Sequence, residues 1–261
     1  MSTKVTEPCI SGNKATKKNS PSTTLDTLEV TSDLFFSKNH ERLYRWATRK
    51  KFNQQTFTAL IDVADRKQQK LYWKSYHCNS VLLQNETVLQ GSLCRKRWCQ
   101  HCNRIKTAEL IKGYHAPLVD MQKEDSFYFV TLTAPTVSGR KLNSEIDKRN
   151  KAFRRIKDNL RKNYGMKLNG VRKTEITYTK GKFHPHFHMI IQGKQEAFKL
   201  QELWLDQFPN ASLKAQDITL IDPSDVNNLL EVFKYAVKPE VKDVTHAKAY
   251  NHIYKLSLIH I

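Results

Sequence analysis

The sequence predicts an α+β protein built around a central antiparallel sheet. Three observations predict this class: segments rich in aromatic and β-branched residues, amphipathic helix-like segments between them, and the order in which the two alternate from residue 126 to residue 238. That order is strand, helix, strand, strand, helix, strand, helix. It is typical of a split βαβ, ferredoxin-like or RRM-like arrangement. We expect the helices to cover one face of the sheet and to leave the other face free for a ligand.

Local signals predict the bounds of each element. In chain order we expect a strand at 126–135, a helix at 144–163, strands at 171–179 and 184–192, a helix at 195–208, a strand at 217–222 and a helix at 224–238. Pro135 ends the first strand, and Pro239 ends the last helix, because proline lacks the amide hydrogen that both structures use. Lys180 and Gly181 predict a tight turn that makes a hairpin of the second and third strands.

The remaining chain divides by composition. We expect a disordered polar tail (1–30), an accessory helical segment (31–75), a small zinc-binding module (76–110), the main α+β domain (120–240) and an incomplete C-terminal segment (241–261). The last six residues, LSLIHI, coincide with one reading frame of a transposon-derived sequencing adapter. We therefore expect the natural chain to continue past about Lys255; the alternative is an ordinary short apolar strand.

Charge indicates the kind of partner. The 261 residues include 44 Lys and Arg against 25 Asp and Glu, a net charge of +19. Such an excess favours a polyanion, with nucleic acid first. An acidic membrane surface is the weaker alternative, because no amphipathic lysine-rich helix or lipidation signal is present. Without a signal peptide or a run of about 18 apolar residues, we expect a cytoplasmic protein that does not span a membrane.

Four of the five cysteines have the spacing of a structural zinc site. Cys99 and Cys102 form a C-x2-C pair, Cys94 lies five residues before it, and Cys78 completes a set of four thiolates. His77 or His101 is an alternative to one thiol. Since four protein ligands leave no open position, the Zn²⁺ should support folding and not catalysis.

Cations surround this module. Arg95, Lys96, Arg97 and Arg104 lie beside Trp98, a mixture that suits a nucleic-acid backbone. For any single one of these residues, a solvated basic face is an equally good interpretation. Lys173, in the second strand of the main domain, is a further candidate for a DNA contact.

Alternate histidines in the third strand predict a second metal site. Alternate residues of a strand share a face, so His186 and His188 can bind one divalent ion. If the turn is centred on Lys180 and Gly181, opposite residues have numbers that sum to 361, which places Glu175 beside His186. Two imidazoles and one carboxylate with open positions suit Mg²⁺ or Mn²⁺ acting as a Lewis acid.

Two neighbours of this predicted site are less certain members. The same register places Lys173 beside His188. His184 is a weaker ligand candidate, because Pro185 disturbs the pleat between it and His186.

The last predicted helix carries a nucleophile candidate. Glu231, Tyr235 and Lys238 fall at i, i+4 and i+7, one above the other on a single helix face. A tyrosine that covers a sheet edge is the alternative. A phenol with a pKa of about 10 needs a polarised phosphate and a nearby cation to attack well, and Lys238 is that cation.

Three segments resemble a known family. HPHFHMII resembles the histidine–hydrophobe–histidine signature of HUH endonucleases, FYFVTLTAP resembles the strand motif that precedes it, and EVFKYAVK resembles the catalytic helix of plasmid rolling-circle replication initiators, the Rep proteins. The cysteine module also resembles one in those initiators. The resemblance covers about residues 78 to 240 and implies that residues 120–240 form an HUH endonuclease domain of the single-tyrosine type.

The resemblance implies a function. A metal-dependent nickase would attack plasmid origin DNA with Tyr235, form a 5′-phosphotyrosyl link and free a 3′-hydroxyl for replication. Glu231, which stands where two-tyrosine relatives carry a second tyrosine, would activate water to end the cycle. Host helicase and replication proteins would be the partners. Two alternatives stay open: a rolling-circle transposase or relaxase, and a non-catalytic zinc-containing nucleic-acid-binding protein.

Overall fold

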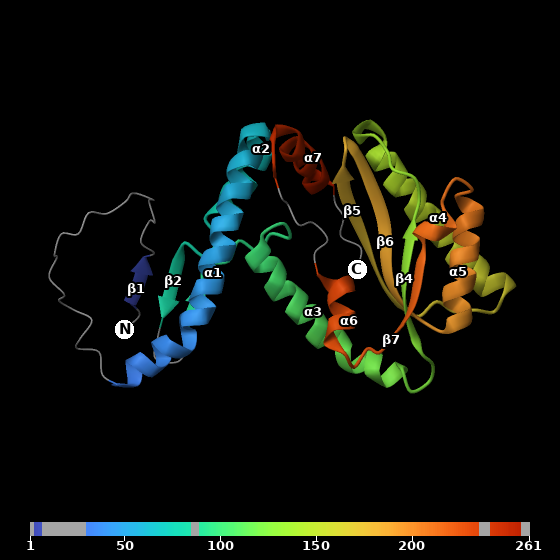
Figure 1. Cartoon of the computed structure of the whole chain (residues 1–261), viewed down its shortest axis with the longest axis horizontal. Coiled ribbons are helices and arrows are strands. Elements are labelled where there is room, and N and C mark those ends of the chain that lie inside the picture. Colours follow the sequence, from blue (N-terminus) through green and yellow to red (C-terminus); the bar gives the residue numbers. More distant parts are fainter. Residues whose placement is uncertain (1–2, 7–29, 85–88, 235–240, 257–261) are drawn as a thin grey trace.

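Antiparallel pairing of four strands organises the centre of the molecule (Figure 1). The computed structural model describes residues 3–6, 30–84, 89–234 and 241–256. The main sheet has the order β5-β6-β4-β7 and consists of β4 (Phe127–Thr133), β5 (Gly170–Thr179), β6 (Lys182–Gln192) and β7 (Asp217–Ile221). The predicted α+β class is confirmed, and each predicted strand of this domain is present with bounds that differ by a few residues.

The β5–β6 hairpin has the predicted turn. Lys180 and Gly181 have φ of 50° and 77°, which is the left-handed backbone that a two-residue hairpin turn requires. Glu175 therefore pairs with His186 and Lys173 pairs with His188, in the register that the turn predicts. Because side chains alternate, the histidines and the apolar residues between them, such as Phe187, lie on opposite faces.

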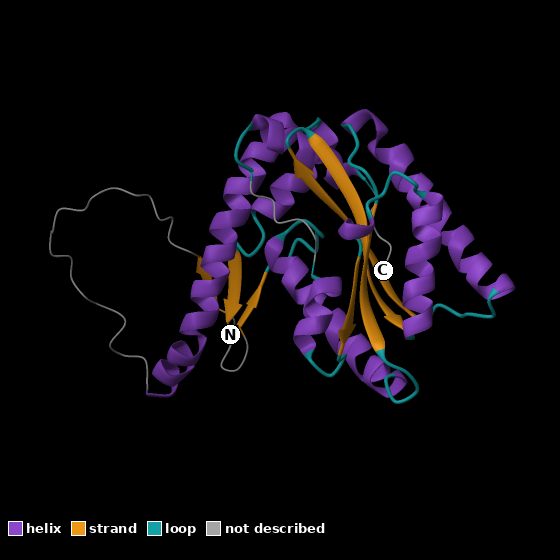
Figure 2. Ribbon diagram, turned by 45° about the vertical axis from the view of Figure 1, so that its right-hand side comes forward, coloured by secondary structure: helices purple, strands orange, loops and turns teal. Residues whose placement is uncertain are grey.

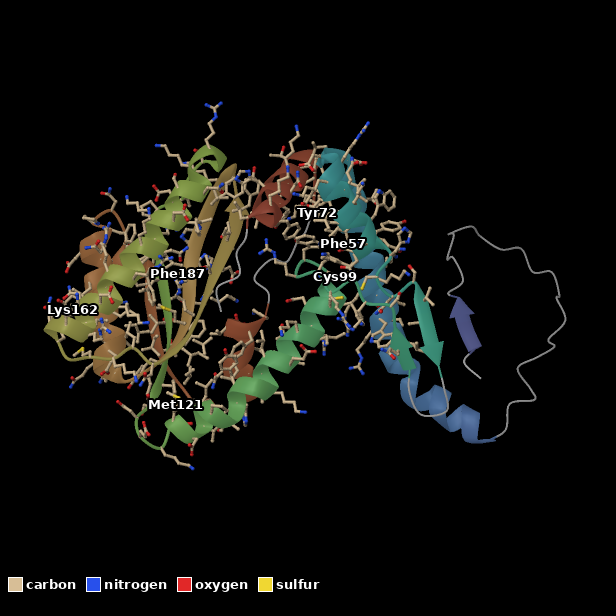
Figure 3. The ribbon with its side chains drawn as sticks, turned by 180° about the vertical axis from the view of Figure 1, so that it is seen from behind. Phe57, Tyr72, Cys99, Met121, Lys162 and Phe187 are labelled. Atoms are coloured by element: carbon tan, nitrogen blue, oxygen red, sulfur yellow. The ribbon has the colours of Figure 1, made fainter. Side chains whose placement is uncertain are left out.

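Two helices cover one face of the sheet (Figure 3). They are α4 (Leu142–Asn163) and α5 (Lys194–Gln207). Phe187 contacts the rings of Phe153 on α4 and Trp204 on α5, with centroids 5.8 and 5.4 Å away. Trp204 is fully buried, and its indole N–H donates to the carbonyl oxygen of Thr133 at 2.8 Å. This layer is the main core of the domain.

The expectation that the other face stays free of helices is wrong at one end. Helices α3 (Gln100–Met121) and α6 (Val226–Phe233) pack there on Phe127, Val171 and Ile190. These apolar side chains point away from α4 and α5, so a second layer of helices is needed to bury them. Beyond them, the same face carries the polar side chains of the candidate site. Figure 1 shows α3 and α6 on the side of the sheet opposite α4 and α5.

The segment before the main domain is helical, as predicted. It forms α1 (Val30–Val63) and α2 (Arg66–Tyr76), which pack against α7 (Val244–Lys255) from the C-terminal segment. Phe57, Tyr72 and Ile253 are buried between them, and the Tyr72 hydroxyl donates to the Asn251 side-chain oxygen at 2.9 Å. Residues 244–255 are thus part of the fold.

A small second sheet lies beside α1 (Figure 2). It contains β1 (Thr3–Thr6), β2 (Val81–Gln84) and β3 (Leu89–Gly91) in that order, all antiparallel. The prediction of a disordered tail is therefore wrong at Thr3–Thr6. Its sequence, TKVT, is rich in β-branched residues, which favour strands once a partner edge is available.

Two further differences concern helices. The long helix α3 was not expected, because its sequence lacks a clear apolar stripe. Helix α6 begins after the side-chain cap of Asp225 and ends at Phe233, five residues before the predicted Lys238. Lys234 is already extended, with a ψ of 138°.

Short 3-10 turns lie at Gly139–Lys141 and Leu213–Ala215. Among the described residues, none of the helices has the length and hydropathy needed to cross a bilayer.

Candidate metal centres

The histidine site is built from the middle of the main sheet. Glu175 on β5 and His186 and His188 on β6 lie on the face away from α4 and α5, with their ligand atoms within 4.8 Å of one another. The Glu175 Oε2 atom lies 3.2 Å from His188 Nε2 and 4.0 Å from His186 Nε2. One cation can therefore contact all three side chains, as the hairpin register predicts.

Backbone and hydroxyl groups orient both imidazoles. His186 Nδ1 lies 3.0 Å from the carbonyl oxygen of His184. A carbonyl only accepts, so Nδ1 carries the proton and Nε2 keeps its lone pair toward Glu175. His188 Nδ1 lies 3.1 Å from the hydroxyl of Thr131 on β4. That hydroxyl can accept from Nδ1–H, which leaves Nε2 of His188 as a metal donor.

The charge states also fit a cation. Burial lowers the pKa of His186 to about 4, so the imidazole is neutral at neutral pH. Burial alone would raise the pKa of Glu175, but its close contact with His188 and the positive charge of Lys173 outweigh burial and lower the pKa. A neutral nitrogen donor and an ionised carboxylate result. This donor set, with room for further ligands, fits a divalent metal ion.

His184 is not a member of this cluster. Within the described residues, the three-ligand group contains Glu175, His186 and His188 and leaves His184 out. The ring of His184 stacks on that of His186 with centroids 5.1 Å apart. Its carbonyl, not its imidazole, contributes to the site.

The structure places Lys173 differently from the expectation of a DNA contact. Its side chain is 10% exposed, and its Nζ atom lies 3.6 Å from Glu175 Oε2. The same atom donates to the carbonyl oxygens of Glu231 and Lys234, each at 2.9 Å. The DNA-contact prediction is wrong, because a buried ammonium with these partners is not presented to a DNA surface. Burial lowers the pKa of Lys173, and Glu175 opposes this shift.

Of the three residues predicted on one face of the last helix, the structure describes Glu231. Glu231 lies on α6, where its exposed carboxylate forms an ion pair with Lys234. Tyr235 and Lys238 lie outside the described residues. Helix α6 ends at Phe233, before both of them, and the predicted stacking of Glu231, Tyr235 and Lys238 on one helix face stays a prediction. Sequence reasoning missed Lys234 and Thr131 as neighbours of the site.

The four predicted cysteines form a second cluster. Their sulfur atoms lie within 4.8 Å of one another, and Cys102 Sγ is 3.5 Å from Cys78 Sγ and 3.6 Å from Cys94 Sγ. All four are free thiols. Tetrahedral zinc with bonds of about 2.3 Å requires sulfur–sulfur distances of about 3.8 Å, close to those observed. Neither His77 nor His101 belongs to the group.

Donors around the sulfurs support a thiolate site. The amides of Cys94 and Arg95 point at Cys78 Sγ and Cys102 Sγ at 3.5 and 3.3 Å. The side chain of Asn53, which lies on α1, donates to Cys99 Sγ at 3.2 Å. Cys99 caps the N-terminus of α3, where the helix dipole favours negative charge. Figure 3 shows Cys99 at the place where α1 and α3 meet.

The predicted basic surface is only partly available. Arg95 and Arg104 are exposed and Lys96 is half-buried, whereas Arg97 donates to the carbonyl oxygens of Tyr254 and Leu256. Arg97 thus binds the C-terminal segment. Trp98 is buried, with its indole N–H donating to Ser75 Oγ at 2.9 Å, so the idea that this aromatic faces DNA is wrong.

Sequence reasoning also missed a cation near Arg104. Arg49 on α1 has its pKa lowered by burial and by the nearby charges of Arg104 and Arg45. These arginines are distant from Arg104 in the sequence, and no local pattern connects them.

Comparisons with known proteins agree on one family. A family model described as "Replication protein" matches residues 85–257. A "Protein rep" of Staphylococcus aureus is 28% identical over 183 residues, 62% of this chain and 79% of that protein. A "Protein rep" of Streptococcus pneumoniae is 25% identical over 193 residues, 64% of this chain and 58% of that protein. One of Lentilactobacillus hilgardii is 30% identical over 124 residues, 46% of this chain and 39% of that protein. No solved structure matches the chain.

Glu175→Gln should weaken Mn²⁺ binding by about tenfold or more, because the site loses its only charged ligand among the three. Titration calorimetry of the folded protein measures this affinity. Asp217→Asn is the matched control, since Asp217 is an exposed carboxylate that pairs with Thr131 from the edge strand β7. Equal Mn²⁺ affinities in wild type and Glu175→Gln would remove Glu175 from the metal shell.

Cys102→Ser should lower the zinc content of the purified protein from one atom toward none and lower its melting temperature. The physical reason is that metal binding at a structural site contributes folding free energy directly. Elemental analysis and thermal unfolding measure the two effects. Cys9→Ser serves as the control, because the predicted set of four thiolates does not include Cys9. A zinc-free wild type with unchanged melting temperature would contradict the assignment.

Proposed function

Because the chain belongs to the replication protein family, we propose that it is a plasmid replication initiator that nicks one DNA strand at a double-strand origin. The observation that carries the proposal is the Glu175, His186 and His188 cluster, which lies on the sheet face away from α4 and α5, beside the end of α6. Two residues after Phe233, at the end of α6, the sequence has Tyr235. A tyrosine nickase needs a metal site and a tyrosine nucleophile, and the sequence supplies both.

The reaction is a transfer of a phosphoryl group. The phenol oxygen of Tyr235 attacks the scissile phosphorus after loss of its proton, the bond to the 3′-oxygen breaks, and that oxygen leaves as a hydroxyl once protonated. Glu175, His186 and His188 would hold a Mg²⁺ or Mn²⁺ ion, which would supply Lewis-acid polarisation of the phosphate. His186 and His188 hold their Nε2 atoms toward that position. The 5′-phosphotyrosyl product conserves the phosphodiester energy, and the 3′-hydroxyl primes synthesis. Lys238, three residues after Tyr235 in the sequence, is proposed to supply a positive charge.

Glu231 is proposed to end the cycle as a general base. Its carboxylate is exposed on α6, close in sequence to Tyr235, and can accept a proton from water that attacks the phosphotyrosyl bond. Its ion pair with Lys234 must open first, because a carboxylate held by an ammonium is a poorer base. An exposed pair of this kind opens at low cost, since surface ion pairs contribute about 1 kcal/mol or less.

The rest of the chain fits this role. We infer that the order β5-β6-β4-β7, with α4 and α5 on one face, is the split βαβ palm of an HUH endonuclease spanning about 120–240. The cysteine cluster is proposed to hold structural Zn²⁺ within 76–110. Arg95, Lys96 and Arg104 are proposed DNA contacts, and origin DNA and a host helicase are the proposed partners. The relatives named "Protein rep" favour an initiator over a transposase or relaxase.

Tyr235→Phe should abolish a covalent protein–DNA adduct while leaving DNA binding unchanged. The change removes only the attacking oxygen. The assay incubates a single-stranded oligonucleotide library with Mn²⁺ and detects the adduct as a shifted band after denaturation. Tyr164→Phe is the control, because Tyr164 is an exposed tyrosine at the end of α4. An adduct that persists in Tyr235→Phe, or its absence from folded, zinc-loaded wild type, would contradict the proposal.

Glu231→Gln should form the adduct at the wild-type rate but release the DNA at least about tenfold more slowly, because general-base catalysis is worth about 10² to 10⁴. Pulse-chase decay of the isolated adduct measures the release. Glu202→Gln offers a matched surface change, since Glu202 forms a similar i,i+3 ion pair with Lys199. Release at the wild-type rate from Glu231→Gln would refute the base role.

A further inference from the structure

Lys173 connects two parts of the proposed site that the sequence separates. Its Nζ atom lies 3.6 Å from Oε2 of Glu175, the carboxylate of the candidate metal cluster. The same Nζ donates to the carbonyl oxygens of Glu231 and Lys234 at 2.9 Å each. Two of the three N–H donors of the ammonium are thus used by backbone carbonyls, and the carboxylate lies at ion-pair distance. The side chain is only 10% exposed, so its partners are protein groups.

The two carbonyls belong to the end of α6. The last carbonyls of a helix have no partner within the helix and need one elsewhere. Lys173 provides it from the neighbouring sheet. The Thr107 hydroxyl on α3 adds a third tie, because it donates to the carbonyl oxygen of Phe233 at 3.1 Å. Lys234 leaves the helical conformation at this point, and its carbonyl belongs to the peptide bond that joins it to Tyr235.

We propose that Lys173 is a positioning residue. It binds Glu175 and the carbonyls of Glu231 and Lys234 at once, and so holds the end of α6 and Lys234, the residue before Tyr235, beside the proposed metal site. The inference rests on the proposed nickase function. Lys173 touches neither DNA nor metal in this role. It keeps the backbone of Lys234 at a fixed distance from the Glu175 carboxylate. Misplacement of a reacting group by about 1 Å can cost about a hundredfold in rate.

The charge of Lys173 separates this role from a metal-binding one. An ammonium beside Glu175 repels a divalent ion bound to the same carboxylate. Its loss should therefore leave Mn²⁺ affinity unchanged or raise it. A residue that merely supports the metal ligands would show the opposite sign, because ligands that lose their support bind metal less well.

Lys173→Met tests the proposal, because methionine keeps most of the length and removes the charge and the donors. At saturating Mn²⁺ we expect kcat for adduct formation to fall by about tenfold to a hundredfold, with KM for the oligonucleotide within about twofold of wild type. Mn²⁺ affinity should not fall. Hydrogen exchange should accelerate in the peptide that covers residues 229–234 and not in the β5–β6 hairpin. The reason is that only the end of α6 loses the hydrogen bonds that Lys173 donates.

Lys182→Met is the control, because Lys182 is an exposed lysine on the same hairpin. If Lys173→Met does not fold, Lys173→Arg keeps the charge with a different reach, and the same fall in kcat is expected. An unchanged kcat in either folded variant overturns the inference, as does a rate that excess Mn²⁺ restores. A wild type that forms no adduct instead contradicts the proposed function, and the two failures are therefore distinguishable.

Discussion

The pairing register of β6 with its two neighbours is the constraint on which the candidate site depends. Side chains alternate along a strand, so a slip of one residue would move His186 and His188 into the core and Phe187 to the surface. Three features hold the register: the left-handed turn at Lys180 and Gly181, the packing of Phe187 against α4 and α5, and the pairing with β4. The polar cluster on one face thus exists because the apolar residues on the other face are buried.

Much of this arrangement is readable from sequence, and the parts that are not have a common cause. The contact between Glu175 and His186 is predictable because a short turn determines which residues of a hairpin lie opposite each other. Thr131 is not predictable in the same way, since β4 reaches β6 only through the fold and no turn connects them. The buried positions of Lys173 and Trp98 were missed for the same reason. Both look like surface residues until α6 and α7 cover them.

Helix α3 links the two candidate metal centres. Cys99 caps its N-terminus and Cys102 lies in its first turn. Its middle contacts the end of α6 through the Thr107 hydrogen bond and the stacking of Tyr114 on Phe233. Helix α3, which begins at the cysteine cluster, therefore supports the end of α6, two residues before Tyr235 in the sequence. This gives a physical reason for the proposed structural zinc site to accompany the proposed nickase site. It also explains why α3 is present despite its weak apolar periodicity, because its anchors are the sulfur cluster and α6.

The central claim is that the sheet places Glu175, His186 and His188 around one divalent ion. Anomalous diffraction from crystals of the protein soaked in Mn²⁺ tests this most directly, because manganese is located independently of the assumed ligands. The account predicts one peak at about 2.1 Å from the Nε2 atoms of both histidines and from a carboxylate oxygen of Glu175. A peak that is absent from this face, or bound without the two histidines, would contradict it.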